Sequence, residues 1–498
     1  MTHTATTPTV QLSRPLRGED LRAAAGPLHV AVDERVAARL GRGREHLRAV
    51  LADDERPVYG AKTGFGALVG FAGRADEADQ CDNTLAHLGA GQGPDLPLPV
   101  VRAALLVRAW SLAQGLSGVS PHVVEGVAAM FGSTFTPAVP RHGSVGASGD
   151  LIPLAYAAQA LRGRGSAYVD GVRLPAADAL ERVGLAPLEL DGRDALALVN
   201  GTSVTTAALS LALDRVRACH RAAQDLTCLL ADLLGCAPAF LDARLLGAFA
   251  HPGAAVVGER MRGVLAGVRA SGERPLQEPY SLRCSPQLLG AAEDALRYAD
   301  GVVAADLAGV SDNPLFFPDD DAVVHGGNFF GQPAAYAGDV LAAVAASVGN
   351  LVERQLDLLV DPGRNTGLPP MLAAGPGQQH GLQGVQLATT ALVAELRRTA
   401  VPASTQSLPT NLHNQDVVPF GTQAALRSHD GAELLWLLCG SLALGLRQAA
   451  HVGARRPTAA GTAALLDRLA AAIPPVDPDR PLDAEVRLAA ELVTGLGC

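Results

Sequence analysis

The sequence predicts a mostly α-helical protein with long, buried helices. Of its 498 residues, 48% are hydrophobic but only 4% are aromatic. Alanine, leucine and valine must therefore build the core, and a core rich in alanine and leucine favours helices. Several stretches are apolar on every side, which is typical of helices that pack among other helices. The chain is long enough for one large core or for several domains.

Five alanine- and leucine-rich stretches carry the helical pattern, and we expect most of them to form helices of unusual length. They are residues 101–131, 195–234, 333–360, 382–399 and 433–452. Proline-rich turns at 362–370, 402–409 and 474–481 interrupt the pattern without resembling long linkers. We expect a smaller N-terminal part, residues 1–200, followed by a helical bundle, residues 201–498, in one catalytic unit.

The net charge and the distribution of cysteines argue against several classes of function. The formal net charge is -10 and no long Lys/Arg run occurs, which argues against nucleic-acid binding as the main role. The seven cysteines are scattered and form no CxxC pair, so we expect a reducing compartment, no disulfide framework and no metal site. The first 20 residues contain no apolar signal core. We therefore expect a cytoplasmic protein.

Two apolar stretches raise the question of a membrane span. Residues 195–213 carry no charge but are interrupted by Asn200 and several threonines, and residues 434–446 are more apolar but short. A bilayer span needs about 20 residues. We expect both stretches to be buried helices, with no membrane partner.

The segment GSVGASGD, residues 143–150, gathers three glycines, one alanine and two serines. Ser148 or Asp150 could be the N-cap of a helix beginning at LIPLAYAAQAL. A phosphate cradle is less well supported, because the lysine and the Walker spacing are absent.

A third interpretation of this segment is that its backbone undergoes a chemical reaction. Attack of the Gly149 nitrogen on the Ala147 carbonyl would close a five-membered ring, and dehydration of Ser148 would leave an electrophilic methylene. The residues allow this chemistry but do not require it.

Three further segments are candidates for a site. PVYGAKTGFGALVG (57–70) lacks the GxGxxG spacing and is either a surface loop or a mobile lid. Its Tyr59 could act as a general base if its pKa were lowered. In QEPYSLRCSPQ (277–287), a helical turn would bring Gln277, Tyr280 and Arg283 roughly onto one side of a helix. The arginine could there bind a substrate carboxylate. The alternative is that Arg283 is an ordinary surface arginine. The polar residues 413–416 are either a capped turn or part of a site.

Taken together, these motifs resemble the aromatic amino acid ammonia-lyase and aminomutase family, which has histidine, phenylalanine and tyrosine members. The match runs from VYGAKTGFG to DPDRPLDAEV, and GSVGASGDLIPLAY is its most specific element. LALVNGT, SDNPL, GGNFFGQP and TGLPP add to it. The resemblance implies the long-helix bundle of the ammonia-lyases, which is fumarase/aspartase-like, with a smaller N-terminal part.

The resemblance also implies roles for individual residues. Ala147, Ser148 and Gly149 would cyclise into 4-methylidene-imidazol-5-one (MIO), so that no external cofactor is needed. Tyr59 would remove the β-proton of the substrate, and a homotetramer would build each active site from several subunits. The remaining implied site residues are Asn200 and Tyr280 against the prosthetic group, Gln277 nearby, Arg283 on the substrate carboxylate, and Phe329 in the pocket wall.

Two positions bear on the substrate. His87–Leu88 stands where tyrosine-acting members have His-Leu, and an imidazole there could bind the phenol of tyrosine. The alternative is that His87 is an ordinary histidine at a helix start. Gln415 stands where histidine-acting members carry a glutamate, and resembles the phenylalanine and tyrosine branch. Departures from the family pattern at Lys62 and Trp110 leave room for an unusual substrate.

We therefore expect an ammonia-lyase that converts L-tyrosine to trans-4-coumarate. The alternative within the same chemistry is a tyrosine 2,3-aminomutase that gives β-tyrosine, which would indicate secondary metabolism. A histidine ammonia-lyase is favoured by His87 but opposed by Leu88 and Gln415. A catalytically silent helical homologue that serves as a binding protein is the alternative from a different class.

Overall fold

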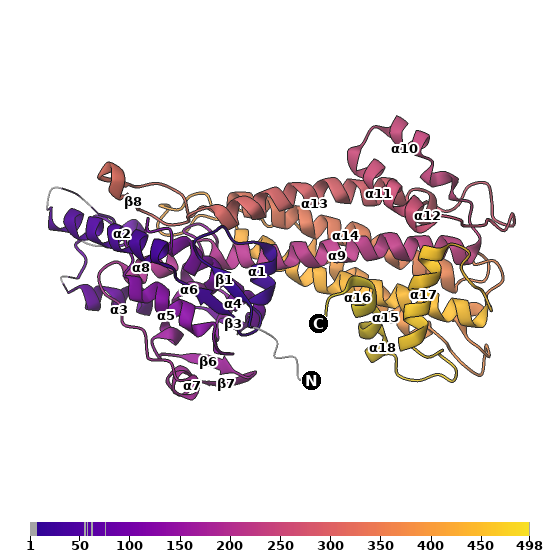
Figure 1. Ribbon diagram of the computed structural model, residues 1–498, viewed down its shortest axis with the longest axis horizontal. Helices are drawn as coiled ribbons and strands as arrows, with labels where there is room; N and C mark the ends of the chain where they lie inside the picture. Colours follow the sequence, from indigo (N-terminus) through magenta and orange to yellow (C-terminus); the bar gives the residue numbers. More distant parts are fainter. Residues whose placement is uncertain (1–6, 54–55, 57, 61–62, 75, 498) are drawn as a thin grey trace. The chain divides into compact units, whose positions relative to one another are not determined.

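The computed structural model describes residues 7–53, 56, 58–60, 63–74 and 76–497. Helices dominate these residues, and the prediction of a mostly α-helical fold is confirmed (Figure 1). The chain forms two compact units, each built from three segments. The first contains Met1–Leu211, Gly301–Gly338 and Pro402–Leu426; the second contains Ala212–Asp300, Asp339–Val401 and Arg427–Cys498. The division into residues 1–200 and 201–498 stays a prediction about functional organisation.

The first unit combines short helices with small sheets. Its helices are α1 (Gly18–Ala23), α2 (Glu34–Ala52), η1 (Gly66–Leu68), α3 (Glu77–His87), α4 (Leu98–Leu112), α5 (Pro121–Met130), α6 (Leu151–Leu161), α7 (Ala176–Val183), α8 (Asp194–Val199) and η3 (Pro318–Asp320). Its strands are β1 (Thr9–Gln11), β2 (His29–Ala31), β3 (Gln92–Asp95), β4 (Thr136–Pro137), β5 (Pro140–His142), β6 (Ser166–Val169), β7 (Val172–Pro175), β8 (Leu315–Phe317) and β9 (Ala322–Val324).

The sheets of this unit are small, with two or three strands each. β1 pairs with β2 in parallel, with Val10 opposite Val30. The pairs β3–β5 and β8–β9 are antiparallel, and β4, β6 and β7 form an antiparallel three-stranded sheet in that order. β5 leads directly into the GSVGASGD segment, and β9 leads into the GGNFFGQP segment. Both glycine-rich segments thus begin from a fixed strand end.

Two of the expected long helices are broken. The stretch 101–131 forms α4 and α5, separated by residues 113–120. Gly115 in this turn has φ +78°, and a Cβ there would lie 2.6 Å from the Arg39 carbonyl oxygen. Pro121 then starts α5, because proline fits the first turn of a helix. The stretch 195–234 likewise forms α8 and α9 (Ser203–Leu234), with a break at residues 200–202. This second break contains Asn200, one of the predicted site residues.

Helices are the regular elements of the second unit within its described residues, and several of its long helices continue into the first unit's segments. The elements are the remainder of α9, η2 (Pro238–Leu241), α10 (Ala243–Phe249), α11 (Pro252–Val264), α12 (Tyr280–Arg283), α13 (Ser285–Ala308), α14 (Gln332–Val360), η4 (Pro370–Leu372), α15 (Gln383–Thr399), α16 (Gly421–Val452), α17 (Ala460–Ala472) and α18 (Asp483–Thr494). The expected helices 333–360 and 382–399 correspond to α14 and α15. The expected helix 433–452 is the C-terminal part of the longer α16.

Small residues let these helices pack closely. A Cβ on Gly349 of α14 would lie 3.0 Å from Leu438 of α16, and one on Gly445 of α16 would lie 2.8 Å from Leu356 of α14. Two described helical stretches are long and apolar enough to cross a bilayer, Asp194–Leu234 and Gln332–Val360. Their most apolar windows are 89% and 67% buried within the protein, as in core helices.

Candidate active site

The GSVGASGD segment lies between β5 and α6, and its last residue is held by a buried polar network. Asp150 occupies the N-cap position of α6, as one interpretation expected, but its side chain makes no capping hydrogen bond. Its carboxylate instead accepts hydrogen bonds from Ser144 Oγ (2.9 Å), Thr205 N (2.9 Å) and Thr422 Oγ1 (2.7 Å). Burial raises the pKa of Asp150, and these donors oppose the rise. The network ties the segment to α9 and α16.

Gly149 cannot be another residue in this conformation. Its φ is +69°, and a Cβ would lie 2.5 Å from the carbonyl carbon and 2.6 Å from the nitrogen of Gly201. Its N–H donates to the Phe329 carbonyl oxygen over 2.9 Å. The backbone is thus clamped between the residue-200 break and the GGNFFGQP segment. A glycine is required for the close approach as well as for the dihedral angle.

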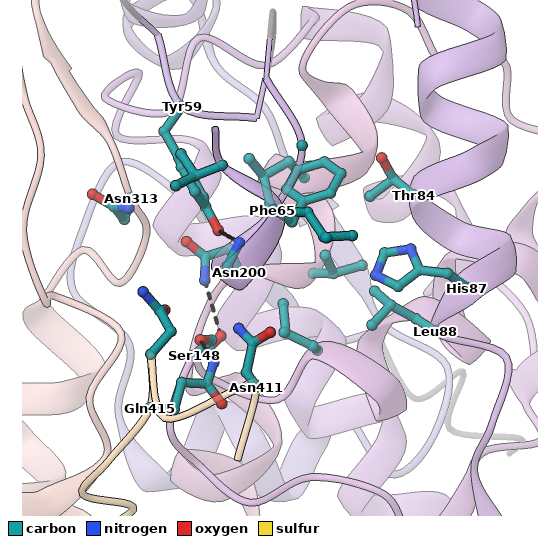
Figure 2. A pocket seen from close by; sticks show the side chains of 18 of the residues that line it. Tyr59, Phe65, Thr84, His87, Leu88, Ser148, Asn200, Asn313, Asn411 and Gln415 are labelled. Atoms are coloured by element: carbon teal, nitrogen blue, oxygen red, sulfur yellow. Dashed lines mark hydrogen bonds between the residues drawn. The ribbon is translucent and has the colours of Figure 1, made fainter. Parts of the chain in front are cut away.

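Ser148 is held by two side-chain amides. Asn200 Nδ2 donates to the Ser148 carbonyl oxygen over 2.9 Å, and Gln415 Nε2 donates to Ser148 Oγ over 2.6 Å (Figure 2). Asn200 reaches this position because it ends α8 with φ -87° and ψ 73°, where α9 has not yet begun. Its Oδ1 is buried and has no hydrogen-bond partner among the described residues. That acceptor is available to a ligand.

Gln415 is positioned by a tight turn. Thr410 and Gln415 form a two-hydrogen-bond bridge through their backbones, 3.0 and 3.3 Å long. Between them, Asn411, Leu412 and His413 all have positive φ values of 52–61°. The predicted polar cluster 413–416 is therefore a turn that presents Gln415 to Ser148. The N-cap alternative for this cluster does not account for that contact.

The loop that carries Tyr59 folds back on itself. The Tyr59 phenol oxygen accepts a hydrogen bond from Gly66 N over 2.8 Å, and the Tyr59 N–H donates to His325 Nε2 over 3.3 Å. Burial raises the pKa of Tyr59, and the Gly66 N–H partly opposes this. The lowered pKa that a general base would need is thus not present in this state. Residues 57, 61 and 62, which include Lys62, lie outside the described residues.

His87 and Leu88 lie at the C-terminal end of α3, so the idea of a helix-start histidine is wrong. The Phe65 ring stacks on the His87 imidazole, with centroids 5.9 Å apart and planes at 15°. The same Phe65 ring meets Tyr59 edge-on at 6.0 Å. Phe65 therefore lies between the Tyr59 phenol and the His87 imidazole, as Figure 2 shows.

These residues surround one cavity of about 1030 Å³ in the first unit, at the upper end of the usual size for ligand sites. Most of the predicted site residues line it, namely Tyr59, His87, Leu88, Ala147, Ser148, Asn200, Phe329 and Gln415. Sequence reasoning missed several lining residues, namely Phe65, Gln80, Thr84, Asn313 and Asn411. Phe65 lies in the segment 57–70 and Asn313 in the SDNPL motif, but nothing in the sequence distinguished either residue from its neighbours.

Three predicted residues lie elsewhere, in the second unit. Tyr280 and Arg283 begin and end the single turn α12, whereas Gln277 precedes it, so the expectation of one helical face for all three is wrong for Gln277. The Arg283 guanidinium lies 4.6 Å from the centre of the Tyr280 ring. Tyr280 is 70% exposed. None of the three lines the cavity described above.

Within the described part of the chain, no group of three or more His, Cys, Asp or Glu side chains is arranged to hold a metal ion. The polar groups around Ser148 are amides, hydroxyls and backbone groups. Such a set suits the orientation of an organic substrate more than the binding of a cation.

Comparison with known proteins identifies the family of the chain. The family model for aromatic amino acid lyases matches residues 16–471. The chain is 39% identical to a tyrosine ammonia-lyase of Cereibacter sphaeroides, with 96% of each chain covered, and 38% identical to a histidine ammonia-lyase of Symbiobacterium thermophilum, with 93% and 92% covered. The crystal structure of a tyrosine aminomutase from Streptomyces globisporus superposes with a TM-score of 0.91 at 31% identity, covering 98% of this chain and 97% of that one. The chain therefore belongs to the aromatic amino acid lyase family of ammonia-lyases and aminomutases, and it is a carbon–nitrogen lyase.

Proposed function

We propose that this enzyme is an MIO-dependent tyrosine ammonia-lyase, which converts L-tyrosine to trans-4-coumarate and ammonia. The observation that carries the proposal is one cavity that is lined by Ala147 and Ser148 on the one hand and by His87 on the other. The first supplies a site for the α-amino group. The second supplies a polar partner for the far end of an aromatic ring.

The residues around Ser148 fit an MIO group formed from Ala147, Ser148 and Gly149. Gly149 has no room for a side chain, and Ala147 is buried. Asn200 donates to the Ser148 carbonyl and keeps an unpartnered Oδ1 among the described groups. The group would supply an electrophile for the amine of the substrate. Asn200 would hold it through the Ser148 carbonyl oxygen, which the ring retains, whereas the contacts of Gln415 with Ser148 Oγ and of Phe329 with the Gly149 N–H belong to the uncyclised chain.

Tyr59 is the proposed general base for the β-proton. Its phenol oxygen already accepts the Gly66 N–H, which stabilises the phenolate more than the phenol. Because burial raises the pKa of Tyr59, the base form is a minor species at neutral pH. We expect the rate to rise with pH for this reason.

A homotetramer would complete the site. Arg283 is the proposed partner of the substrate carboxylate, with Tyr280 and Gln277 beside it, all supplied by another subunit. Tyr280 is exposed in the isolated chain, as expected for a side chain that acts in a neighbouring copy. Three apolar side chains that line the cavity are also exposed, namely Leu68, Phe71 and Val417. A second copy that covers them would bury this apolar surface.

Two alternatives have specific support. The likeness to a tyrosine aminomutase structure favours a tyrosine 2,3-aminomutase that gives β-tyrosine and belongs to secondary metabolism. The 38% identity to a histidine ammonia-lyase favours histidine as substrate, but Leu88 closes the end of α3 with an apolar side chain.

Five of the six described cysteines are buried and all six are free, which supports a cytoplasmic location.

Product analysis tests the proposal. Purified protein is incubated separately with L-tyrosine, L-phenylalanine and L-histidine, and the products are separated and identified by mass. We expect trans-4-coumarate from tyrosine as the main product. β-Tyrosine as the main product would make the enzyme an aminomutase, and faster conversion of histidine would overturn the tyrosine assignment.

A further inference from the structure

Arg108 is a fully buried arginine of α4 that does not line the cavity but contacts two segments next to it. Its Nε and Nη2 both donate to the Ala197 carbonyl oxygen, Nε over 2.9 Å. Its Nη1 donates to the Ser311 carbonyl oxygen over 2.7 Å. The first acceptor lies on α8 and the second in the SDNPL motif. One side chain of α4 therefore joins α8 to this motif.

The Ala197 carbonyl is the one that α8 would need in order to continue. In an α-helix each carbonyl oxygen accepts from the N–H four positions ahead, which for Ala197 is that of Gly201. The Gly201 N–H instead donates to the Val199 carbonyl oxygen over 3.1 Å. A Cβ on Gly201 would lie 2.1 Å from Arg108 Nη1, so the guanidinium also fills the space beside this residue. Arg108 thus replaces the hydrogen bond with which α8 would run on into α9.

Other backbone groups of the break also find partners outside the helix. The Gly201 carbonyl oxygen accepts the Asp150 N–H over 2.7 Å. The Thr205 N–H, which a continuous helix would give to Gly201, donates to Asp150 Oδ2 over 2.9 Å. The Thr202 N–H donates to Ser311 Oγ over 3.1 Å. Because buried backbone groups need such partners, these contacts stabilise the break, and the contact on the α8 side is made by the arginine.

The break determines where the side-chain amide of Asn200 lies. Asn200 leaves the helical path with φ -87° and ψ 73°, and its Nδ2 donates to the Ser148 carbonyl oxygen over 2.9 Å (Figure 2). A helical residue 200 would direct its side chain elsewhere, since the direction of a side chain is coupled to the backbone angles. The contact between Asn200 and Ser148 therefore depends on the break.

We propose that Arg108 is a positioning residue for the prosthetic group, because it ends α8 at Ala197 and so holds Asn200 against the Ser148 carbonyl. The inference rests on the proposed function, in which this carbonyl belongs to a ring formed from residues 147–149. It also gives the SDNPL motif a role, since Ser311 accepts a hydrogen bond from Arg108 as well as from the break. Arg108 acts through Asn200 and not on the substrate.

Arg102 is a matched control on the same helix. It is 2% exposed, and its guanidinium also donates to backbone carbonyl oxygens, namely those of Ala24, Gly26, Phe131 and Phe135. None of these residues lines the cavity. Burial lowers the pKa of both arginines to about 10, so both are charged at pH 7. Arg102→Met and Arg108→Met thus remove the same kind of group, and a loss common to both reflects stability alone.

The intact mass of newly synthesised chains reports formation of the prosthetic group without turnover. In a time course of cell-free synthesis, we expect Arg102→Met to lose two waters at the wild-type rate. Arg108→Met should lose them about 10- to 100-fold more slowly, because the buried Ser148 carbonyl has lost its donor. Equal rates for the two variants would overturn the inference.

Two milder variants decide the outcome if Arg108→Met does not fold. Arg108→Lys keeps the charge but not the fork of donors, so its rate of water loss should be intermediate. Ser311→Ala removes the acceptor of the Thr202 N–H and should slow water loss about two- to tenfold. Wild-type rates for both variants would overturn the inference.

Crystal structures of the wild type and of both methionine variants distinguish failure of this inference from failure of the proposed function, because they do not depend on ring formation. We expect the Gly201 N–H to bond to the Ala197 carbonyl, and Asn200 to leave Ser148, in Arg108→Met alone. If no chain loses water but this rearrangement occurs, the proposed prosthetic group is wrong and the role of Arg108 stands. If the wild type loses two waters and Arg108→Met keeps the contact between Asn200 and Ser148, the proposed function stands and the inference is wrong.

Discussion

Substitution of Gly149 by alanine should block formation of the prosthetic group through backbone overlap. The new Cβ would lie 2.5–2.6 Å from backbone atoms of Gly201, which cannot turn aside as a side chain can. The left-handed φ of +69° adds about 1–2 kcal/mol, and the overlap adds about 1–3 kcal/mol. We expect Gly149→Ala to be destabilised by about 2–5 kcal/mol by this sum.

Gly165 offers a matched control for this prediction. It has φ +79°, yet no atom lies within 4 Å of the position of a Cβ. Gly165→Ala should therefore cost only the conformational part, about 1–2 kcal/mol. The assay is denaturant unfolding together with the intact mass of each variant. We expect the control to lose two waters, like the wild type, and Gly149→Ala to lose none. A Gly149→Ala chain that loses two waters would refute the reasoning.

Three further predictions follow from the site. Because burial raises the pKa of Tyr59, kcat/KM should rise towards alkaline pH, and Tyr59→Phe should abolish elimination without changing the mass loss; a variant with wild-type kcat would contradict this. Burial and Arg193 lower the pKa of His325, so its neutral Nε2 accepts the Tyr59 N–H at pH 7 and loses this ability as pH falls through that pKa. The glutamine of His325→Gln accepts at any pH, so its pH profile should lack one acidic inflection of the wild type, and identical profiles would refute the assignment. Arg283→Ala should raise KM for tyrosine about 10- to 100-fold through loss of a charged hydrogen bond to the carboxylate, with Arg283→Lys intermediate, and an unchanged KM would exclude Arg283 from carboxylate binding.

The long helices were predictable because their signal is local. α14 and α15 carry helical patterns with no proline beyond the first turn, and their bounds agree with expectation to within one residue. The helix break at Asn200 was not predictable from periodicity, since both flanks are equally apolar. Its cause is tertiary: the turn lets Asn200 bind the Ser148 carbonyl and lets Gly201 accept the Asp150 N–H over 2.7 Å.

The site was only partly predictable, because its contacts join distant parts of the chain. Ala147, Ser148 and Gly149 stand out locally as three small residues in a row within a glycine-rich segment. The contact from Thr422 to Asp150 spans 272 positions, and that from Gln415 to Ser148 spans 267. No single-sequence pattern encodes such a pairing, so the environment of these residues came from the structure.

The most direct measurement is the mass of the tryptic peptide 142–162, which contains residues 147–149 between the cleavage sites at Arg141 and Arg162. If Ala147, Ser148 and Gly149 form the prosthetic group, the wild-type peptide is lighter than its sequence by two water molecules. The Ser148→Ala peptide, which has no hydroxyl to lose, keeps at least one of them. A wild-type peptide at its full sequence mass would contradict the proposed chemistry of this site.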